Sequence, residues 1–246
     1  MYHLKASLAT TRRIIEQLEH DKRTIALMFL APTLLMSLLA WVFSDNKNVF
    51  DMVAPAMLGV FPFIIMFLVT SITTLRERTG GTLERLMAMP VGKGDIVAGY
   101  GLAFALFGAV QSLITSAVAI YLLDLKVDGP MWFVVLVALL DTVLGVALGL
   151  MTSAFARTEF QAVQFMPALI LPQILVCGLF LPLDKLPDVL ETIAYCLPLT
   201  YAVDALNLVT KHSDITSEMW RDIAVVCGFI LAALVLASLT LRRRTK

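Results

Sequence analysis

Six long apolar segments, separated by shorter polar ones, dominate the pattern of this chain. A helix needs about 20 apolar residues to cross the hydrocarbon core of a bilayer, and each segment meets that length. None of them has the pattern of a cleavable signal peptide, so we expect the first to be retained as a span. The predicted spans are residues 24–43, 53–75, 96–123, 131–153, 163–182 and 222–241. The pattern therefore predicts an all-α integral membrane protein with six transmembrane helices, in a single domain over residues 1–246.

Residues 4–20 form a separate amphipathic element before the first span. At 100° per residue, its apolar positions fall within an arc of about 120°. These positions are Leu4, Leu8, Thr11, Ile14, Ile15 and Leu18, and the opposite side carries Lys5, Arg12, Arg13, Glu16, Glu19 and His20. A basic amphipathic helix ahead of a span is typical of an interfacial helix that lies in the lipid headgroup plane. The alternative is an ordinary helix that packs on a soluble partner.

A charged segment, residues 76–95, lies between the second and third spans and has helix signals of its own. The signals are a capping Thr79 or Thr82, Glu84 in the first turn, Leu83, Leu86 and Met87 at helical spacing, and Pro90, Gly92 and Gly94 at the end. A short helix on a tight loop at a membrane face is suited to docking against another protein. The alternative is a solvated loop whose apolar residues rest on the bilayer surface.

The segment 183–221 is much longer than a connector between two spans needs. It holds two helical stretches, Leu186–Tyr195 and Tyr201–Thr210, which are too short and too polar to cross a bilayer. Backbone at membrane depth has to be covered by protein rather than by lipid. We therefore predict an outer re-entrant helical hairpin, which enters the membrane part-way or caps an outer cavity.

Composition supports membrane residence and removes several kinds of chemistry. Hydrophobic residues make up 59% of the chain and charged residues 15%, and mean hydropathy is +0.85, against about 45–50% and about 25% in soluble domains. The three cysteines have no CxxC spacing and the three histidines lie outside the apolar segments, so we expect neither a disulfide framework nor a metal site. The chain also lacks the G-x-x-x-x-G-K-[ST] pattern, so it has no phosphate loop of its own for ATP.

Lys and Arg residues set the predicted orientation, because cytoplasmic segments of membrane proteins carry an excess of them. With the N-terminus inside, fourteen of the nineteen fall in inner segments, and the outer segments hold only Lys47, Lys126, Lys185, Lys211 and Arg221. Both termini and residues 76–95 are therefore predicted to be cytoplasmic.

Asp141 is the one ionisable residue deep inside a predicted span. A charge at that depth costs about 2.5–3.5 kcal/mol on insertion scales, and such residues usually face a bundle interior or a wet path. Its candidate hydrogen-bond partners are Gln111, Ser112 and Thr115 on the third span and Gln173 on the fifth. Gln111, Asp141 and Gln173 are accordingly candidates for a translocation path. The alternative is a protonated Asp141 that joins helices by hydrogen bonds.

Small residues and prolines inside the spans bear on helix packing. Gly145 and Gly149 form a small-xxx-small pair that lets another helix approach closely. The prolines at 32, 55, 62, 167 and 172 predict kinks, with ordinary packing as the alternative.

The order of these elements resembles the membrane subunit of type-2 ATP-binding-cassette (ABC) exporters, and two motifs carry the resemblance. The first is Arg76-Glu77-Arg78, then Gly81-Thr82-Leu83-Glu84-Arg85-Leu86 and Pro90, which looks like the coupling segment of that family. The second is Leu181-Pro182-Leu183 and Leu186-Pro187, then Pro198-Leu199-Thr200-Tyr201-Ala202-Val203-Asp204-Ala205-Leu206, which looks like its outer helical hairpin. Asn207 departs from the family pattern, in which many members have Arg, and this bears on the polarity of the outer face.

The resemblance implies roles for individual residues and for partners. The ATPase-coupling residues would be Glu77, Gly81, Thr82, Glu84, Arg85, Leu86 and Pro90, and the outer hairpin would use Pro198, Thr200, Tyr201 and Asp204. The chain would be a transport subunit rather than an enzyme, with no cofactor of its own, because two separate ABC ATPase subunits would bind ATP and Mg. A second permease subunit, in a homodimer, would complete the pathway in a bacterial or archaeal cell membrane. Lipid would surround it, and we expect no nucleic-acid partner.

These inferences predict a permease subunit that exports an amphiphilic or hydrophobic molecule such as a drug, an antibiotic or a lipid. Within the family, the chain looks closest to the short antibiotic-export type, the daunorubicin-resistance permeases. The alternative is a self-contained proton-linked transporter, or an intramembrane enzyme, that uses Asp141. The lack of His, Lys, Arg and Glu inside the spans argues against that alternative, because a proton relay normally needs several ionisable groups.

Overall fold

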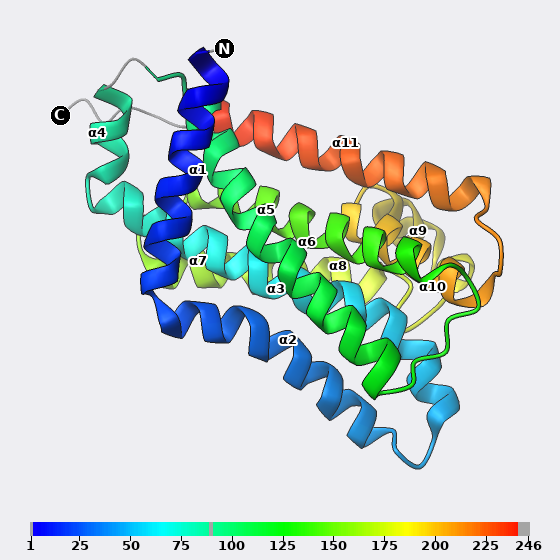
Figure 1. Cartoon of the computed structure of the whole chain (residues 1–246). Coiled ribbons are helices and arrows are strands. Elements are labelled where there is room, and N and C mark those ends of the chain that lie inside the picture. Colours follow the sequence, from blue (N-terminus) through cyan, green and yellow to red (C-terminus); the bar gives the residue numbers. More distant parts are fainter. Residues whose placement is uncertain (1, 89–90, 241–246) are drawn as a thin grey trace.

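The computed structural model describes residues 2–88 and 91–240, and within these ranges every regular element is helical. The α-helices are α1 (Tyr2–His20), α2 (Lys22–Val42), α3 (Lys47–Thr79), α4 (Thr82–Ala88), α5 (Lys93–Ala117), α6 (Met131–Ser153), α7 (Glu159–Phe165), α8 (Leu171–Val176), α9 (Asp188–Tyr195), α10 (Pro198–Lys211) and α11 (Ser217–Thr240). Two π-helical segments, η1 (Val118–Leu122) and η2 (Met166–Ile170), continue α5 and α7, and η3 (Leu183–Lys185) is a 3₁₀ turn. Figure 1 shows α4, the N-terminal part of α1 and the start of α5 gathered at one end of the bundle. We call this the α4 end.

Six helical segments are long and apolar enough to cross a membrane, which confirms the predicted all-helical membrane fold. They are α2, α3, α5 with η1, α6, α7 through α8, and α11. The second and fifth differ most from the predicted boundaries. With 33 residues, α3 is about 50 Å long, which exceeds the thickness of an apolar layer of about 30 Å. Arg76 and Arg78 both lie in its last turn. The fifth segment ends at Val176 rather than at residue 182, because the chain turns at Gly178, where φ is +89°.

The core of the bundle is the contact between α3 and α6. A Cβ atom added to Gly145 would lie 2.5 Å from the carbonyl oxygen of Phe63, and one added to Gly149 would lie 2.6 Å from that of Phe67. These glycines therefore let the two backbones meet directly, which increases van der Waals contact where no hydrophobic effect drives helices together. The close approach predicted from the Gly145–Gly149 spacing is confirmed.

Helix α1 lies across the α4 end and packs on α5 (Figure 1). The contact is close at Gly99, where an added Cβ would lie 2.6 Å from the Cβ of Thr10. The hydroxyl of Thr11 donates a hydrogen bond to the carbonyl of Gly99 at 3.1 Å. The buried face of α1 thus turns toward α5, whereas Leu4 and Leu8 are 64% and 52% exposed. The predicted apolar arc is therefore divided between a protein contact and an outward surface.

The two helices predicted in segment 183–221 are present as α9 and α10, and they meet at an angle of 92°. Hydrogen bonds close the corner, from the Thr200 hydroxyl to the carbonyl of Ala194 at 2.8 Å and from the Tyr201 hydroxyl to that of Tyr195 at 2.7 Å. At its far end α10 is tied to the loop before α6, where the N–H of Gly129 donates to the carbonyl of Val209 at 3.0 Å. This hairpin lies at the opposite end of the bundle from α4 (Figure 1).

Candidate functional site

Helix α4 is attached to the bundle by a very short linker. Only Gly80 and Gly81 separate it from α3, and Gly81 adopts a φ of +77°, which glycine tolerates and other residues rarely do. Leu83 is 2% exposed and packs in a cluster with Ile96 and Tyr100 of α5, among others. Leu83 therefore anchors the start of α4 in this cluster.

The structure places the predicted coupling residues around this helix in different ways. Thr82, Glu84, Arg85 and Leu86 lie within α4, Gly81 precedes it, Glu77 belongs to α3, and Pro90 lies outside the described residues. Arg85 is exposed, Leu86 and Thr82 are half-buried, and Glu77 is buried. Arg85 is thus accessible at the surface of the subunit, whereas Glu77 bonds to side chains within the subunit.

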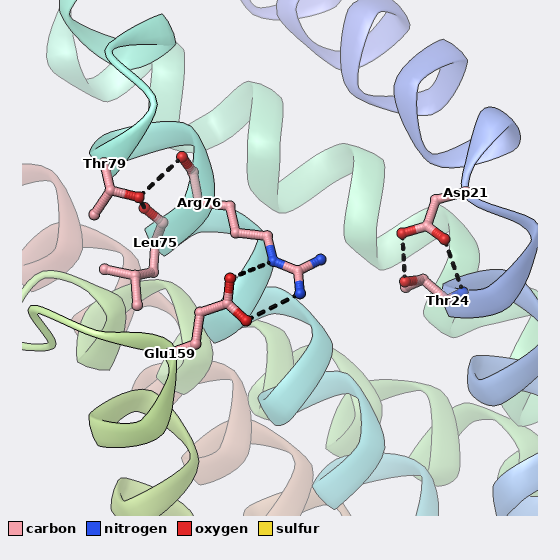
Figure 2. Close-up of polar contacts among 6 residues, drawn as sticks. All are labelled: Asp21, Thr24, Leu75, Arg76, Thr79 and Glu159. Carbon is pink, nitrogen blue, oxygen red and sulfur yellow. Dashed lines mark hydrogen bonds and ion pairs between the residues drawn. The ribbon is translucent and has the colours of Figure 1, made fainter.

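Arg76, in the last turn of α3, forms a two-pronged ion pair with Glu159 at the start of α7 (Figure 2). Its Nε lies 2.8 Å from Oε1 and its Nη2 lies 3.0 Å from Oε2. This fork-to-fork arrangement is the strongest geometry for an Arg–carboxylate pair. Both side chains are about half exposed, at 55% and 53%, so solvent reaches the pair.

Glu77, the next residue, is 6% exposed and accepts three hydrogen bonds. The donors are Nη1 of Arg13 at 3.0 Å, Nε2 of Gln17 at 2.6 Å and the hydroxyl of Tyr100 at 3.0 Å. Arg13 also donates to the Tyr100 hydroxyl at 2.8 Å, and its guanidinium lies 5.8 Å from the centre of the Tyr100 ring. A buried carboxylate with this many donors is well compensated. Glu77 therefore joins α3 to both α1 and α5.

Arg78, the third residue of the turn, donates hydrogen bonds to the carbonyls of Ser153 and Ala156. These groups lie at and just beyond the C-terminus of α6, where helix carbonyls have no partner within the helix and where a positive charge complements the helix dipole. Arg78 therefore joins α3 to the end of α6.

The three side chains together define one junction, which we call the Arg76–Arg78 triplet. Successive residues of a helix point about 100° apart, so three in a row reach three different sides of α3. The sequence indicated this triplet as a motif but did not identify its partners Arg13, Tyr100 and Glu159. Arg13 was placed on the polar face of α1, and only the fold shows that this side of the helix turns toward α3.

Asp141 is fully buried on α6, and the structure gives it different surroundings from those expected. A Cβ added to Gly59 would lie 2.7 Å from its Oδ2 and 2.8 Å from a methyl carbon of Leu206, so glycine makes room for the carboxyl group. Among the described residues neither oxygen has a hydrogen-bond partner, and the same holds for both amide atoms of Gln111. The expected bond between Asp141 and Gln111 is therefore not formed.

The other residues considered as partners of Asp141 donate hydrogen bonds within their own helices. Thr115 donates to the carbonyl of Gln111 at 2.9 Å, Ser112 to that of Ala109 at 3.1 Å, and Gln173 to that of Leu169 at 3.0 Å. All of these bonds lie within one helical turn. The three path candidates Gln111, Asp141 and Gln173 thus do not form a connected hydrogen-bonded chain within the described part of the protein.

In the outer hairpin the predicted residues have clear local roles. Pro198 stands at the start of α10, where its missing N–H costs nothing. Thr200 and Tyr201 make the corner bonds already described, and Asp204 is half-buried on the next turn of α10.

Comparison with known proteins identifies the class that this architecture defines. The family model described as "ABC-2 type transporter" matches residues 6–209. The chain therefore belongs to the ABC-2 type transporter family and is a multi-pass membrane protein of the ABC permease type.

Three relatives illustrate the range of similar proteins. ABC transporter G family member 20 of Dictyostelium discoideum is 28% identical over 82% of this chain and 28% of its own length. The linearmycin resistance permease protein LnrN of Bacillus subtilis is 32% identical over 65% of this chain and 40% of its own length. The probable multidrug ABC transporter permease YbhS of Escherichia coli is 23% identical over 63% of this chain and 41% of its own length. The chain thus matches less than half of the length of each of these relatives.

Proposed function

We propose that this protein is the permease subunit of an ATP-driven exporter and that α4 is the element through which a separate ATPase subunit acts on it. The observation that carries the proposal is the connection from α4 to the rest of the bundle. Two glycines join α4 to α3, and the Arg76–Arg78 triplet then joins α3 to α1, α5, α6 and α7. A displacement of α4 would therefore reach most of the bundle directly.

ATP and Mg would be bound by two ATPase subunits, and two copies of the permease would enclose the pathway. Closure of the ATPases would push on α4 and favour one of two arrangements of the spans, which is the physical content of an allosteric transport cycle. The α4 end would face the cytoplasm of a bacterial or archaeal cell. This agrees with the excess of Lys and Arg residues in the segments predicted to be cytoplasmic, which include residues 76–95. The exposed Leu4 and Leu8 of α1 would then rest in the adjacent lipid.

The substrate would be an amphiphilic or hydrophobic molecule. Support comes from two relatives, one named as a linearmycin resistance permease and the other as a probable multidrug permease. The rival mechanism, a proton-linked transporter based on Asp141, has less support. Among the described residues Asp141 has no hydrogen-bond partner to or from which a proton could pass.

Purification of the tagged chain from its native membranes in mild detergent tests the proposal. We expect an ABC ATPase to copurify in equal amount with the permease, and we expect vesicles holding the complex to export an amphiphilic dye only when ATP is supplied. A chain that is purified without an ATPase, and that moves the dye in response to a proton gradient, would contradict the proposal and support the Asp141 mechanism.

A further inference from the structure

The fifth membrane-crossing segment is interrupted in its middle, unlike the continuous α6. Its helix α7 gives way to the π-helical segment η2 before α8 begins. Pro167 lies within η2 and Pro172 at the start of α8, and neither can donate the backbone hydrogen bond of a continuous helix. Prolines and π-helical turns are the usual places where helices bend. These features favour bending of the segment between α7 and α8, although the structure has Glu159–Val176 as one membrane-crossing segment.

On the α4 side of η2, most side chains of α7 are exposed, and its apolar packing is limited to Ala162 and to Phe165 next to η2. It has seven residues and is about 10 Å long. Ala162 is its only buried residue, in a small cluster with Leu75 and Ala156, and Phe160 is 71% exposed. The main polar tie to α3 is the Arg76–Glu159 ion pair at the end farthest from η2. Glu159 is the residue of α7 that would move farthest if α7 turned about η2, so the ion pair holds the end of α7 with the largest displacement.

The Arg76–Glu159 pair differs from the neighbouring Arg13–Glu77 pair in how easily it can open. Both members of the first are about half exposed, whereas Glu77 is 6% exposed and has three donors. Although the two-pronged geometry of the Arg76–Glu159 pair is favourable, its exposed groups can exchange their hydrogen bonds for water when the pair opens. Opening a buried pair instead leaves a charge without compensation. The buried Glu77 interactions with α1 and α5 are therefore expected to persist, whereas the exposed Arg76–Glu159 ion pair with α7 can open.

Arg76 also has a second acid close by. Asp21 caps the N-terminus of α2 and accepts hydrogen bonds from both the N–H and the hydroxyl of Thr24, at 3.2 and 2.7 Å. The charges of Arg76 and Asp21 interact, and Figure 2 shows the guanidinium lying on the side of Arg76 that faces both Glu159 and Asp21. When Glu159 leaves, the guanidinium of Arg76 therefore still has the carboxylate of Asp21 on the same side.

We propose that α7 is an inner gate, hinged at η2 and closed onto α3 by the Arg76–Glu159 ion pair, and that this ion pair opens and closes once in each transport cycle. The proposal rests on the exporter function proposed above. Helix α3 is also the helix joined to α4. Arg76 lies only three residues before the end of α3, so a movement of α4 would be transmitted through the two glycines and less than one helical turn to reach the ion pair.

Reversible cross-linking tests the gate. Arg76→Cys and Glu159→Cys are combined in a chain whose three native cysteines are replaced by Ala, and the pair is bridged with a short, reducible bis-methanethiosulfonate reagent. A bridging reagent is needed because an Arg–Glu contact spans two long side chains. We expect bridged complexes to keep their ATPase subunits and to lose export by about tenfold or more, with recovery on reduction. Export by the bridged protein at the rate of the reduced protein would overturn the gate.

A second measurement does not depend on export by the cysteine variant. In the purified complex, we expect the yield of the bridge to change by about twofold or more between the nucleotide-free state and the state trapped with ATP and vanadate. Equal yields would overturn the proposal. The matched control is the Arg12–Glu16 pair, which is likewise exposed but lies within α1. Its Cys–Cys bridge should form equally in both states and leave export unchanged.

The outcomes also separate this proposal from the exporter function. If no ATPase copurifies with the wild-type chain, the exporter function itself has failed. If the ATPase copurifies and wild-type export depends on ATP, but the bridge neither blocks export nor responds to nucleotide, only the gate has failed.

Discussion

The hydroxyl of Tyr100 donates a hydrogen bond to the carboxylate of Glu77 at 3.0 Å, although the two residues lie 23 positions apart on different helices. Arg13 of α1 contacts both of them, so three helices share one buried polar cluster directly beside the two-glycine linker to α4. The cluster fixes the orientation of α1 relative to α3 and α5. Mutations that break this cluster should therefore lower the free energy of unfolding of the protein. They should also weaken its coupling to the ATPase.

The first prediction concerns the strength of that cluster. We expect Glu77→Leu to lower the free energy of unfolding by about 1–3 kcal/mol, because the half-buried guanidinium of Arg13 loses its carboxylate, and Tyr100→Phe to lower it by about 1 kcal/mol. Denaturation of the purified protein in detergent measures both changes. An Arg13→Leu, Glu77→Leu double mutant should lose less stability than the two single mutants together.

The control for this cycle is Glu16→Ala, which removes the exposed Arg12–Glu16 pair on the same helix and should change stability by about 0.5 kcal/mol or less. If Glu77→Leu is as mild as Glu16→Ala, the cluster does not hold α1 in place.

The second prediction concerns the contact between α3 and α6. We expect Gly145→Ala and Gly149→Ala each to destabilise the protein by about 1–3 kcal/mol, because the new methyl groups would meet the backbone carbonyls of Phe63 and Phe67. The temperature of unfolding in detergent is the measurement. Gly228→Ala in α11 is the matched control, since no atom of the described residues outside its own helix turn lies within 4 Å of its added Cβ. Equal unfolding temperatures for the three variants would show that the close contact between α3 and α6 does not contribute to stability.

The third prediction concerns Asp141. We expect Asp141→Asn to preserve folding and export, because Asn has the same shape and no partner among the described residues needs the charge. Asp141→Leu should instead destabilise the protein by about 1–3 kcal/mol, since two methyl groups are bulkier than the carboxylate oxygens that they replace beside Gly59 and Leu206. Loss of export in an Asp141→Asn subunit that still assembles with its ATPase would revive the proton-linked mechanism.

The fourth prediction is the orientation of the chain in the membrane. Single cysteines replace exposed residues in a cysteine-free background, and intact cells are treated with a membrane-impermeant thiol reagent. We expect labelling at positions 47, 126 and 185 and none at 12, 85 and 157 until the cells are opened. Strong labelling of position 85 in intact cells would place α4 on the wrong side for an ATPase partner.

The fifth prediction concerns α4 itself. A Glu84→Arg, Leu86→Asp double mutant should be produced at a normal level, because α4 lies outside the membrane-crossing segments. Its export should fall sharply, with loss of the copurifying ATPase or with ATP hydrolysis that no longer responds to substrate, because a reversed charge at an interface opposes its partner. Glu19→Arg, an exposed charge reversal on α1, is the control and should leave export intact. Normal export from the α4 double mutant would falsify the coupling role.

Several features of this protein could be read from the sequence because they depend on neighbouring residues alone. Apolar length determined the six spans, helical spacing with flanking glycines determined α4, and two short helices with their prolines determined the α9–α10 hairpin. The close contact at Gly145 and Gly149 also followed, because side-chain size at a four-residue spacing is a local property. The bilayer reinforces such patterns, since every backbone polar group within it has to bond inside its own helix or be covered by protein.

The tertiary structure alone decided which side chains meet. Glu77 finds Arg13 and Tyr100, 64 and 23 positions away, and Arg76 finds Glu159, 83 positions away. The sequence pattern put Arg13 on the polar side of α1, but the packing of α1 on α5 turned Arg13 inward. The sequence also offered Gln111 among the candidate partners of Asp141, but as the helices pack neither side chain has a hydrogen-bond partner among the described residues. The physical reason is that hydropathy and propensity act along the chain, whereas the pairing of charged and polar groups depends on how the helices rotate and cross as they pack.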